Sequence, residues 1–277
     1  MKTKLFLITA IIGSLVFTGC KDDDPATPEV VIPKLKTATY YDGTEVTPSY
    51  SEAYEYNASG QIVKIVAEDN SYVTVEYSTG KITLKFVDEL GVQDPNIEEF
   101  ILNDKGLYVS SASTWKKSLK SSIKKNYKSQ LKSQLSILGS SSTTLTYNAD
   151  NYLIEENSTE IDGLNNSSDI TTYTITSGNT TGREYVSTYN DVSTTSNDTF
   201  EFFTDKTNTI GYENMGVTFF GKQDNNLQKK RTQTGESYSY ISNYSYEYDS
   251  YGRVTKQIEK DEANTIIYGQ TTYTYTD

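Results

Sequence analysis

Three pairs of neighbouring acidic residues are the clearest candidates for acid–base chemistry in this sequence. They are Asp88–Glu89, Glu98–Glu99 and Glu155–Glu156, and two carboxyl groups on either side of a glycosidic bond can hydrolyse it. Adjacent residues of a β-strand, however, point to opposite faces of the sheet. We therefore expect that no pair converges on one substrate bond. A polysaccharide hydrolase that draws its carboxylates from distant strands stays as the least favoured function.

The other residue types that usually carry catalysis are scarce. The chain has no histidine and one cysteine, Cys20, so it lacks the commonest general base and the commonest metal ligand. The sequence contains no G-x-S-x-G elbow, phosphate-binding loop or dinucleotide fingerprint. Oxygen atoms of Asn103, Asp104 and Asp249 are candidate calcium ligands, but Asx turns explain these residues more simply. We expect no enzyme activity, no catalytic residue, no metal and no cofactor.

Cys20 follows an N-terminal leader. Lys2 and Lys4 precede the apolar run LFLITAIIGSLVF, which is shorter than the roughly 20 residues that span a bilayer and is typical of a secretory signal. The next residues, FTGC, resemble the bacterial lipobox, whose cysteine is acylated and becomes the new N-terminus. The resemblance implies a signal peptide over 1–19 and lipidation of Cys20. The alternative is an ordinary signal peptide with an unrelated cysteine.

The residues after Cys20 suggest where the protein is anchored. Lys21, Asp22, Asp23 and Asp24 resemble the surface-export signal of lipoproteins from Bacteroidota, although a plain solvated tether is the simpler interpretation. Three of the five prolines lie between residues 25 and 33, and proline-rich chain is extended. We predict a lipidated tether over 20–34 that holds the folded part at the outer membrane, facing the cell exterior.

The composition favours one acidic all-β domain. The formal net charge is −12, and the chain contains 24 tyrosines. A negative protein is a poor partner for nucleic acid or an anionic membrane surface. Tyrosine and threonine favour strands, whereas asparagine, aspartate, serine and glycine favour turns. We predict a single all-β domain over 35–277 that is stabilised by burial, because no second cysteine is present to form a disulfide.

One short phrase occurs four times along the chain. It reads YEYNASGQI from Tyr54, FILNDKGLY from Phe100, LTYNADNYL from Leu145 and YEYDSYGRV from Tyr246. Each copy has two apolar or aromatic residues two apart, which share one face of a strand. A residue that can close an Asx turn follows, and three positions later comes a residue type that accepts positive φ. These pairs are Asn57 and Gly60, Asn103 and Gly106, Asn148 and Asn151, and Asp249 and Gly252. Each copy therefore predicts strand, tight turn, strand.

The copy YEYDSYGRVTK resembles the YD repeat of RHS and teneurin proteins, whose hairpins form one continuous sheet. The chain also resembles a family of uncharacterised Bacteroidota surface lipoproteins with such hairpins and a porin-like all-β fold. Gly221, Lys222, Asn226 and Leu227 carry this second resemblance, although Thr218 stands where that family has a glycine. The resemblance implies a sheet-dominated fold and no known activity.

The strand patterns disfavour a membrane-spanning barrel. A lipid-facing strand has a continuous apolar face about 10 residues long. The stretches SEAYEYN, TTYTIT and YTYTD instead alternate tyrosine or isoleucine with polar residues. We expect a water-soluble antiparallel meander of hairpins, forming a curled or barrel-like sheet with tyrosines on its packed face.

One segment departs from strand alternation. Between residues 114 and 138, an apolar residue recurs about every four positions and lysines fill the remaining faces, which predicts an inserted amphipathic helix. The stripe consists of Trp115, Leu119, Ile123, Tyr127, Leu131, Leu135 and Leu138. The simpler interpretation is a helix that packs on the sheet. The alternative is a basic helix that binds lipid head groups or an acidic partner.

These features favour a non-enzymatic binding module, with a glycan or a protein as ligand. A tyrosine ring stacks on the apolar face of a sugar while its hydroxyl forms a hydrogen bond at the wet edge, although most of these tyrosines are expected to pack the sheet. The alternative is a structural or assembly subunit of an envelope complex. The expected partners are the membrane, through the lipid anchor, and a glycan or envelope protein, with no nucleic acid.

Overall fold

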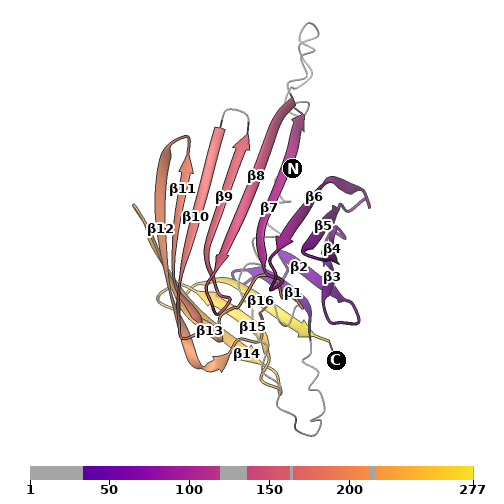
Figure 1. The fold of residues 1–277 in the computed structure, drawn as a ribbon. Coiled ribbons are helices and arrows are strands. Elements are labelled where there is room, and N and C mark those ends of the chain that lie inside the picture. Colours follow the sequence, from indigo (N-terminus) through magenta and orange to yellow (C-terminus); the bar gives the residue numbers. More distant parts are fainter. Residues whose placement is uncertain (1–33, 119–135, 163–164, 212–215, 277) are drawn as a thin grey trace, which may run out of the picture.

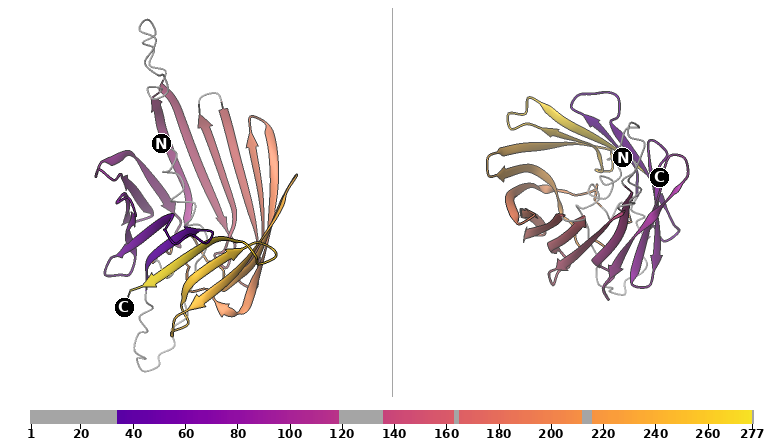
Figure 2. Two further views of the ribbon diagram at one scale, coloured as in Figure 1. Left: turned by 180° about the vertical axis from the view of Figure 1, so that it is seen from behind. Right: turned by 90° about the horizontal axis from the view of Figure 1, so that it is seen from above.

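The computed structural model describes residues 34–118, 136–162, 165–211 and 216–276. They form a closed antiparallel barrel in which each strand pairs with its chain neighbours and β1 pairs with β16 (Figures 1 and 2). The strands are β1 (Leu35–Asp42), β2 (Tyr50–Tyr56), β3 (Ile62–Ala67), β4 (Tyr72–Ser78), β5 (Lys81–Val87), β6 (Gln93–Leu102), β7 (Tyr108–Ser118), β8 (Ser136–Tyr147), β9 (Leu153–Asp162), β10 (Asn165–Thr176), β11 (Asn179–Tyr189), β12 (Val192–Thr207), β13 (Asn226–Gly235), β14 (Ser239–Tyr248), β15 (Val254–Lys260) and β16 (Ile267–Tyr275). The predicted all-β, barrel-like sheet is confirmed.

The four copies of the repeated phrase form tight turns. In the first, Asn57 Oδ1 accepts hydrogen bonds from the backbone N–H groups of Ser59 and Gln61, both at 3.0 Å, and Gly60 has a positive φ. The turns after β6, β8 and β14 repeat this arrangement. Since every one of these turns follows an even-numbered strand of an up-and-down barrel, all four lie at the same end, which we call the hairpin end.

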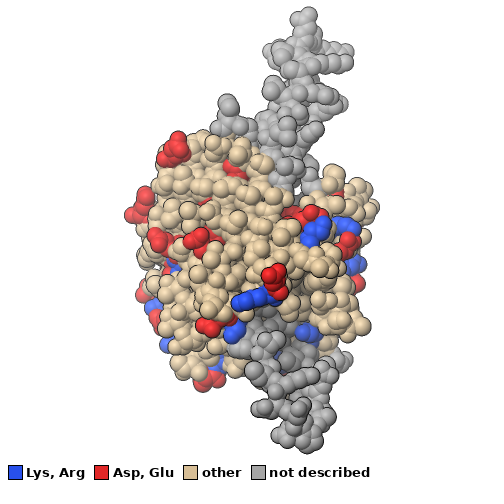
Figure 3. All heavy atoms as spheres, viewed as in Figure 1, with Lys and Arg blue, Asp and Glu red and all other residues tan. Residues whose placement is uncertain are grey.

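The two faces of the wall differ in polarity. Side chains that point into the lumen from β1 to β8 form an apolar cluster that includes Ile62, Val75 and Ile82. The outer face instead carries charged pairs across neighbouring strands, such as Lys64 with Glu55 at 3.2 Å and Lys81 with Glu99 at 2.6 Å. Charged side chains are spread over the face seen in Figure 3. Exposed isoleucines such as Ile101 and Ile170 also lie on the outer face, but charged and hydroxyl side chains separate them. The wall therefore lacks the continuous apolar outer band of a lipid-facing barrel.

Tyrosines contribute much of the inward packing, as the sequence predicted. Those in or against the apolar cluster are Tyr54, Tyr56, Tyr77, Tyr108, Tyr147, Tyr273 and Tyr275. Buried hydroxyl groups need partners, and several of them donate to backbone carbonyls, as Tyr77 does to Ile62 at 2.9 Å and Tyr275 to Val254 at 2.8 Å.

The connection between β12 and β13 crosses the hairpin end. Its described residues, 208–211 and 216–225, are here called the crossing segment. Phe219 accepts a hydrogen bond from the backbone of Tyr108 at 2.7 Å, Lys222 donates to Asn151 at 2.7 Å, and Asn225 donates to Gly178 at 3.0 Å. Val217 and Phe219 join the apolar cluster. The segment therefore ties together hairpins that are far apart in the sequence.

Gly221 shows why the crossing segment has its sequence. Its φ is +85°, and a Cβ at this position would lie 2.5 Å from the carbonyl oxygen of Asn151 and 2.5 Å from the ring of Tyr147. Only glycine fits such a close approach at positive φ. The neighbouring Leu227 is also almost fully buried, so Gly221 and Leu227 are explained by packing.

The predicted helix is wrong where the structure describes it. Residues 114–118 and 136–138 belong to β7 and β8, which pair from Ser110 with Thr144 to Ser118 with Ser136. The backbone N–H and C=O groups of these residues form the hydrogen-bond ladder of a long hairpin. This pairing outweighs the helical spacing of the apolar residues. The rest of the predicted helix, 119–135, lies outside the described residues. So do the signal peptide, Cys20 and Lys21 to Asp24.

Candidate binding site in the barrel lumen

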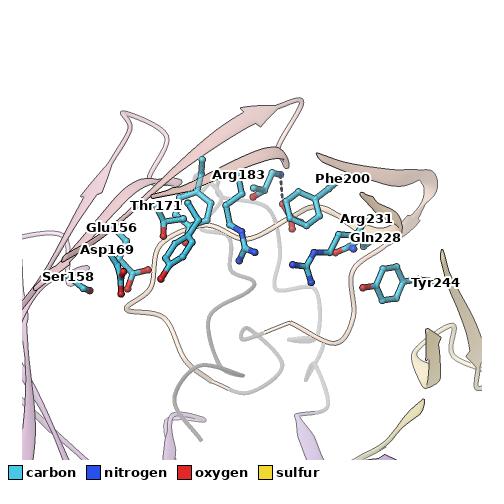
Figure 4. A pocket seen from close by; sticks show the side chains of 13 residues that line it. Glu156, Ser158, Asp169, Thr171, Arg183, Phe200, Gln228, Arg231 and Tyr244 are labelled. Atoms are coloured by element: carbon cyan, nitrogen blue, oxygen red, sulfur yellow. Dashed lines mark hydrogen bonds between the residues drawn. The ribbon is translucent and has the colours of Figure 1, made fainter. Parts of the chain in front are cut away.

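The lumen has two halves of different chemistry. We call the inward side chains of β2 to β8, with Val217 and Phe219, the apolar half, and the inward side chains of β9 to β14 the polar half. A cavity of about 550 Å³ lies in the polar half (Figure 4). It is lined by Glu156, Ser158, Asp169, Thr171, Tyr173, Thr180, Arg183, Tyr185, Phe200, Asp224, Gln228, Arg231 and Tyr244. This size is typical of small-molecule sites, which range from about 300 to 1,000 Å³.

Two arginines project into the cavity and share one carboxylate. Arg183 on β11 lies opposite Asp198 on β12, and Arg231 on β13 lies opposite Phe200. Arg183 Nε and Nη2 approach Asp198 Oδ2 at 2.7 and 2.5 Å, and Arg231 Nε approaches Oδ1 at 2.7 Å. We call these three residues the triad. Asp198 is only 2% exposed, and a buried carboxylate needs compensation for its lost hydration. The two guanidinium groups provide that compensation.

A second carboxylate, Glu259 on β15, acts on the same region. Ser242 donates a hydrogen bond to Glu259 Oε1 at 2.5 Å. Burial lowers the pKa of Arg231, but the hydrogen bond and charge of Asp198, with a smaller effect of the charge of Glu259, hold it above its ordinary value. Asp198 is therefore the direct ion-pair partner of both arginines, and Glu259 adds a weaker negative charge near Arg231.

Two further carboxyl groups line the other end of the cavity (Figure 4). Glu156 lies opposite Thr171, and Asp169 opposite Ser158. Burial raises the pKa of Glu156, and the charge of Asp169 raises it further, while a hydrogen bond to Tyr173 and the charge of Arg183 oppose the rise. Oδ1 of Asp169 is buried and has no hydrogen-bond partner among the described residues. Buried polar atoms are normally paired, so this oxygen is an unused acceptor.

The crossing segment supplies a fifth carboxyl group. The backbone N–H of Thr180 donates to Asp224 Oδ1. Burial raises the pKa of Asp224 to about 6, against the effect of the Thr180 hydrogen bond. Asp224 therefore changes charge close to neutral pH, at the boundary between the cavity and the hairpin end.

A pair of tyrosines lies near the end of the barrel opposite the hairpin end. The rings of Tyr240 on β14 and Tyr268 on β16 have centroids 5.2 Å apart and planes inclined by 30°. They border a second, more open depression together with Asp261 and Glu262. Tyr268 is 36% exposed. These rings offer apolar surface with hydroxyl groups at its edge, as a sugar-binding surface requires.

Two of the three acid pairs singled out from the sequence split between the two faces of the wall, and the third, Asp88–Glu89, lies in the turn after β5. Glu156 lines the cavity, whereas its neighbour Glu155 is exposed. Glu98 is partly buried and burial raises its pKa, whereas Glu99 pairs with Lys81 outside. Asp88 accepts hydrogen bonds from Leu90 and Val92 in the turn after β5. The pairs therefore do not act as pairs, although Glu156 belongs to the site.

Asn103 and Asp249 close Asx turns, as the sequence predicted. Among the described residues, no group of three or more Asp, Glu, Cys or His is placed to hold a metal ion. The described part of the chain also contains no helix long and apolar enough to cross a membrane.

Most of the site was missed by sequence reasoning. Arg183, Asp198, Arg231 and Asp169 carry no motif, because 15 residues separate Arg183 from Asp198 and 33 separate Asp198 from Arg231. The only signal is their shared parity: each sits at an inward position of its strand. That parity becomes visible once the register of β9 to β14 is known.

Comparison with known proteins identifies the fold. No protein-family model and no curated protein matches the chain. A porin-like protein from Bacteroides vulgatus ATCC 8482 is similar, with a TM-score of 0.57 and 12% identity over 87% of this chain and 98% of that one. A porin-like protein from Bacteroides uniformis ATCC 8492 has a TM-score of 0.53 and 17% identity over 91% of this chain and 99% of that one. The chain therefore has a porin-like β-barrel fold, in agreement with the fold that the sequence resemblance implied.

Proposed function

We propose that the protein is a surface lipoprotein that binds a glycan inside its barrel without cleaving it. Cys20 carries the lipid anchor, residues 20–34 form the tether, and Lys21 to Asp24 direct the protein to the exterior of the outer membrane. The observation that carries the proposal is the cavity of the polar half. It combines aromatic rings with charged and neutral hydrogen-bonding groups around a partly open space of about 550 Å³, and such convergence is what ligand sites share.

The polarity of the wall supports a barrel that stands in water. Exposed charged pairs such as Lys64 with Glu55 lie on the outer face among scattered apolar residues, while the large apolar cluster faces inward. A charge that faces hydrocarbon costs about 2–4 kcal/mol at the bilayer midplane. A lipid anchor is then the means by which the barrel stays at the membrane, and a lumen that opens to water admits a soluble ligand.

A polysaccharide hydrolase is the second candidate, and one observation favours it. Burial and the neighbouring charge of Asp169 raise the pKa of Glu156, which is how a general acid is prepared beside a second carboxylate. Incubation of the protein with the bound glycan distinguishes the two functions. New reducing ends that disappear in Glu156→Gln would establish the hydrolase, whereas intact glycan supports the binding module.

The remaining alternative is an assembly subunit. The described strands form a closed ring with β1 paired to β16, but β7 pairs with β6 only from Tyr108 to Ser111 and from Ala112 to Ser118 with β8 alone. Another envelope component could add a strand along this short edge. That edge does not account for the charged and aromatic groups that line the cavity, so glycan binding explains more of the described structure than assembly does.

Glycan binding is tested with the full-length chain, purified from membranes in detergent and screened against a glycan array. We expect at least one saccharide class to bind, and Tyr185→Ala to weaken that binding about tenfold because its ring lines the cavity. Tyr251→Ala is the matched control, because this tyrosine is 83% exposed in a turn at the hairpin end. An array without a bound saccharide, or equal losses for the two variants, would reject the lumen as a glycan site.

The anchor is tested separately in cells. We expect Cys20→Ala to move the protein from the membrane fraction to the soluble fraction, and protease added to intact cells to digest the wild-type protein. Replacement of Asp22, Asp23 and Asp24 by alanine should protect the protein from that protease while leaving it in the membrane fraction. Wild-type protein that resists external protease would contradict surface exposure.

A further inference from the structure

The cavity contains an acceptor that no described residue satisfies. Oδ1 of Asp169 is one of two buried side-chain atoms in the described part of the chain without a hydrogen-bond partner, and the other is the hydroxyl oxygen of Tyr147. An unpaired buried polar atom destabilises the folded protein, because it has lost its hydration without gaining a partner. A ligand that donates a hydrogen bond to Asp169 would recover that cost.

The cavity also contains donors with unused capacity. A guanidinium group has five N–H donors, and the triad uses two of them from Arg183 and one from Arg231. The side chains of Arg183 and Arg231 are 33% and 27% exposed. In Figure 4 both guanidinium groups point into the cavity, so their remaining N–H groups are available to a ligand oxygen.

The charges of the cavity disfavour an anionic ligand in spite of the two arginines. Asp198 forms ion pairs with both of them, and Glu259 adds a weaker negative charge near Arg231. Glu156, Asp169 and Asp224 then add acidic groups around the same space. A carboxylate or sulfate placed there would face more negative than positive groups, and like charges at close range repel strongly in a partly buried site.

A hydroxyl group matches this mixture of donors and acceptors, since it donates one hydrogen bond and accepts others. We propose that the cavity recognises an uncharged saccharide, whose hydroxyl groups donate to Asp169 and Glu156 and accept from Arg183 and Arg231. The rings of Tyr173 and Tyr185 line the same space and cover the apolar faces of the sugar. This inference rests on the proposed function and names the ligand class for the same site.

The test compares saccharides of equal length and different charge. The full-length chain in detergent is titrated with neutral gluco-, manno- and xylo-oligosaccharides, with acidic oligogalacturonates and with cationic chitosan oligosaccharides. We expect a neutral series to bind at least tenfold more tightly than both charged series. Tighter binding of oligogalacturonates or of chitosan oligosaccharides would overturn the inference while leaving glycan binding in place. Absence of binding by every series would reject the proposed function itself.

Residue variants then test the recognition mode. We expect Asp169→Asn and Glu156→Gln each to weaken binding of the neutral saccharide about 10- to 100-fold, because a hydrogen bond to a charged group contributes roughly 1.5–3 kcal/mol. Glu155→Gln is the matched control, since Glu155 directly precedes Glu156 in the chain and is exposed on the outer face. Unchanged affinity in Asp169→Asn, with the fold intact by circular dichroism, would show that Asp169 is not the anchor.

A measurement of thermal stability separates a binding role from a structural one. Oδ1 of Asp169 has no described partner to lose, the hydrogen bond from Tyr185 to the Asp169 side chain can also be accepted by an asparagine oxygen, and loss of the charge removes repulsion with Glu156. Asp169→Asn should therefore melt at the same temperature as the parent or higher. A melting temperature that falls together with the affinity would assign Asp169 to the fold instead of the ligand.

Discussion

Strands β2 to β8 turn isoleucine, valine, leucine and aromatic side chains into the lumen, whereas β9 to β14 turn arginine, aspartate, glutamate and tyrosine into it. Both sets belong to one closed antiparallel sheet with the same alternation of inward and outward positions. The backbone therefore does not decide which half of the lumen is open. The choice of side chain at the inward positions does.

The crossing segment fills only one of the two halves. The rings of Phe219 and Phe220 lie 4.5 Å apart, and Phe219 contacts Phe100 at 6.1 Å between centroids. In the polar half the segment contributes Asp224 to the cavity lining. The apolar inward side chains pack against the apolar residues of the crossing segment. The charged inward side chains keep their hydration and leave a space for ligand. The same segment thus closes one half and borders the cavity in the other.

The largest expected effect comes from the apolar half. Ile82 is 1% exposed, and we expect Ile82→Ala to lower the free energy of unfolding by roughly 3–4 kcal/mol through lost burial and a new cavity. Ile170→Ala is the matched control, because this isoleucine lies on β10 and is 38% exposed; its cost should stay below about 1 kcal/mol. Urea denaturation followed by circular dichroism measures both. Similar losses would mean that the apolar half does not dominate stability.

The second prediction concerns the crossing segment. Gly221→Ala places a Cβ within 2.5 Å of Asn151 and Tyr147 at a positive φ, so we expect a loss of about 2–3 kcal/mol. Gly106→Ala has a similar φ of +76° but nothing within 4 Å of the new Cβ, and should cost only about 1 kcal/mol. The difference between the urea unfolding midpoints of the two variants measures the cost of the close contact with Asn151 and Tyr147. Equal costs would show that the segment moves freely against the hairpin end.

The third prediction uses pH and belongs to the polar half. The pKa of Asp224 is raised from 3.8 to about 6 by burial, so the folded protein binds this proton more tightly than the unfolded chain. The resulting stability is present below about pH 4 and is lost as the pH rises through 6. Asp224→Asn removes the titration, because asparagine stays neutral and its side-chain oxygen can still accept from Thr180. We therefore expect the parent to lose on the order of 2 kcal/mol relative to Asp224→Asn between pH 4 and 7.

This pH series contains its own control. The other titrating groups are common to both proteins, so their effects cancel in the difference. Parallel stability curves for the parent and Asp224→Asn over that range would mean that Asp224 has an ordinary pKa in the folded protein.

The local parts of the fold were predictable from the sequence, because their causes are local. An Asx residue followed three positions later by glycine or asparagine sets a turn within a few residues, and Asn57, Asn103, Asn148 and Asp249 all form such turns. The parity argument for Glu155 and Glu156 held for the same reason. It depends only on the two residues being adjacent in one strand.

Features that depend on pairing between distant strands were not predictable. Closure requires β1 to pair with β16, with Ala38 opposite Tyr273, and no single segment encodes that contact. The apolar stripe from Trp115 has helical spacing, yet Trp115 pairs with Gly139 in the ladder of β7 and β8. The triad likewise exists only because the registers of three strands align Arg183, Asp198 and Arg231.

The smallest expected effect on stability distinguishes the two halves most directly. Replacing all three triad residues at once, as Arg183→Met, Asp198→Leu and Arg231→Met, should leave the free energy of unfolding within about 1 kcal/mol of the parent. Removing a whole buried ion group is often neutral, because the lost attraction is offset by the desolvation that no longer has to be overcome. Asp198→Ala alone should cost roughly 3 kcal/mol, the low end for a broken buried ion pair, since it leaves two partly exposed arginines facing each other. Urea denaturation compares the variants, and titration with a neutral saccharide should show no binding in the triple variant. The paired change Lys230→Met with Glu201→Leu on the outer face, where the two groups lie 3.5 Å apart, is the control and should alter neither quantity.

If the triple variant is as unstable as Ile82→Ala, the triad holds the barrel together as the apolar half does. If it is stable but does not bind, its charges are retained for the ligand.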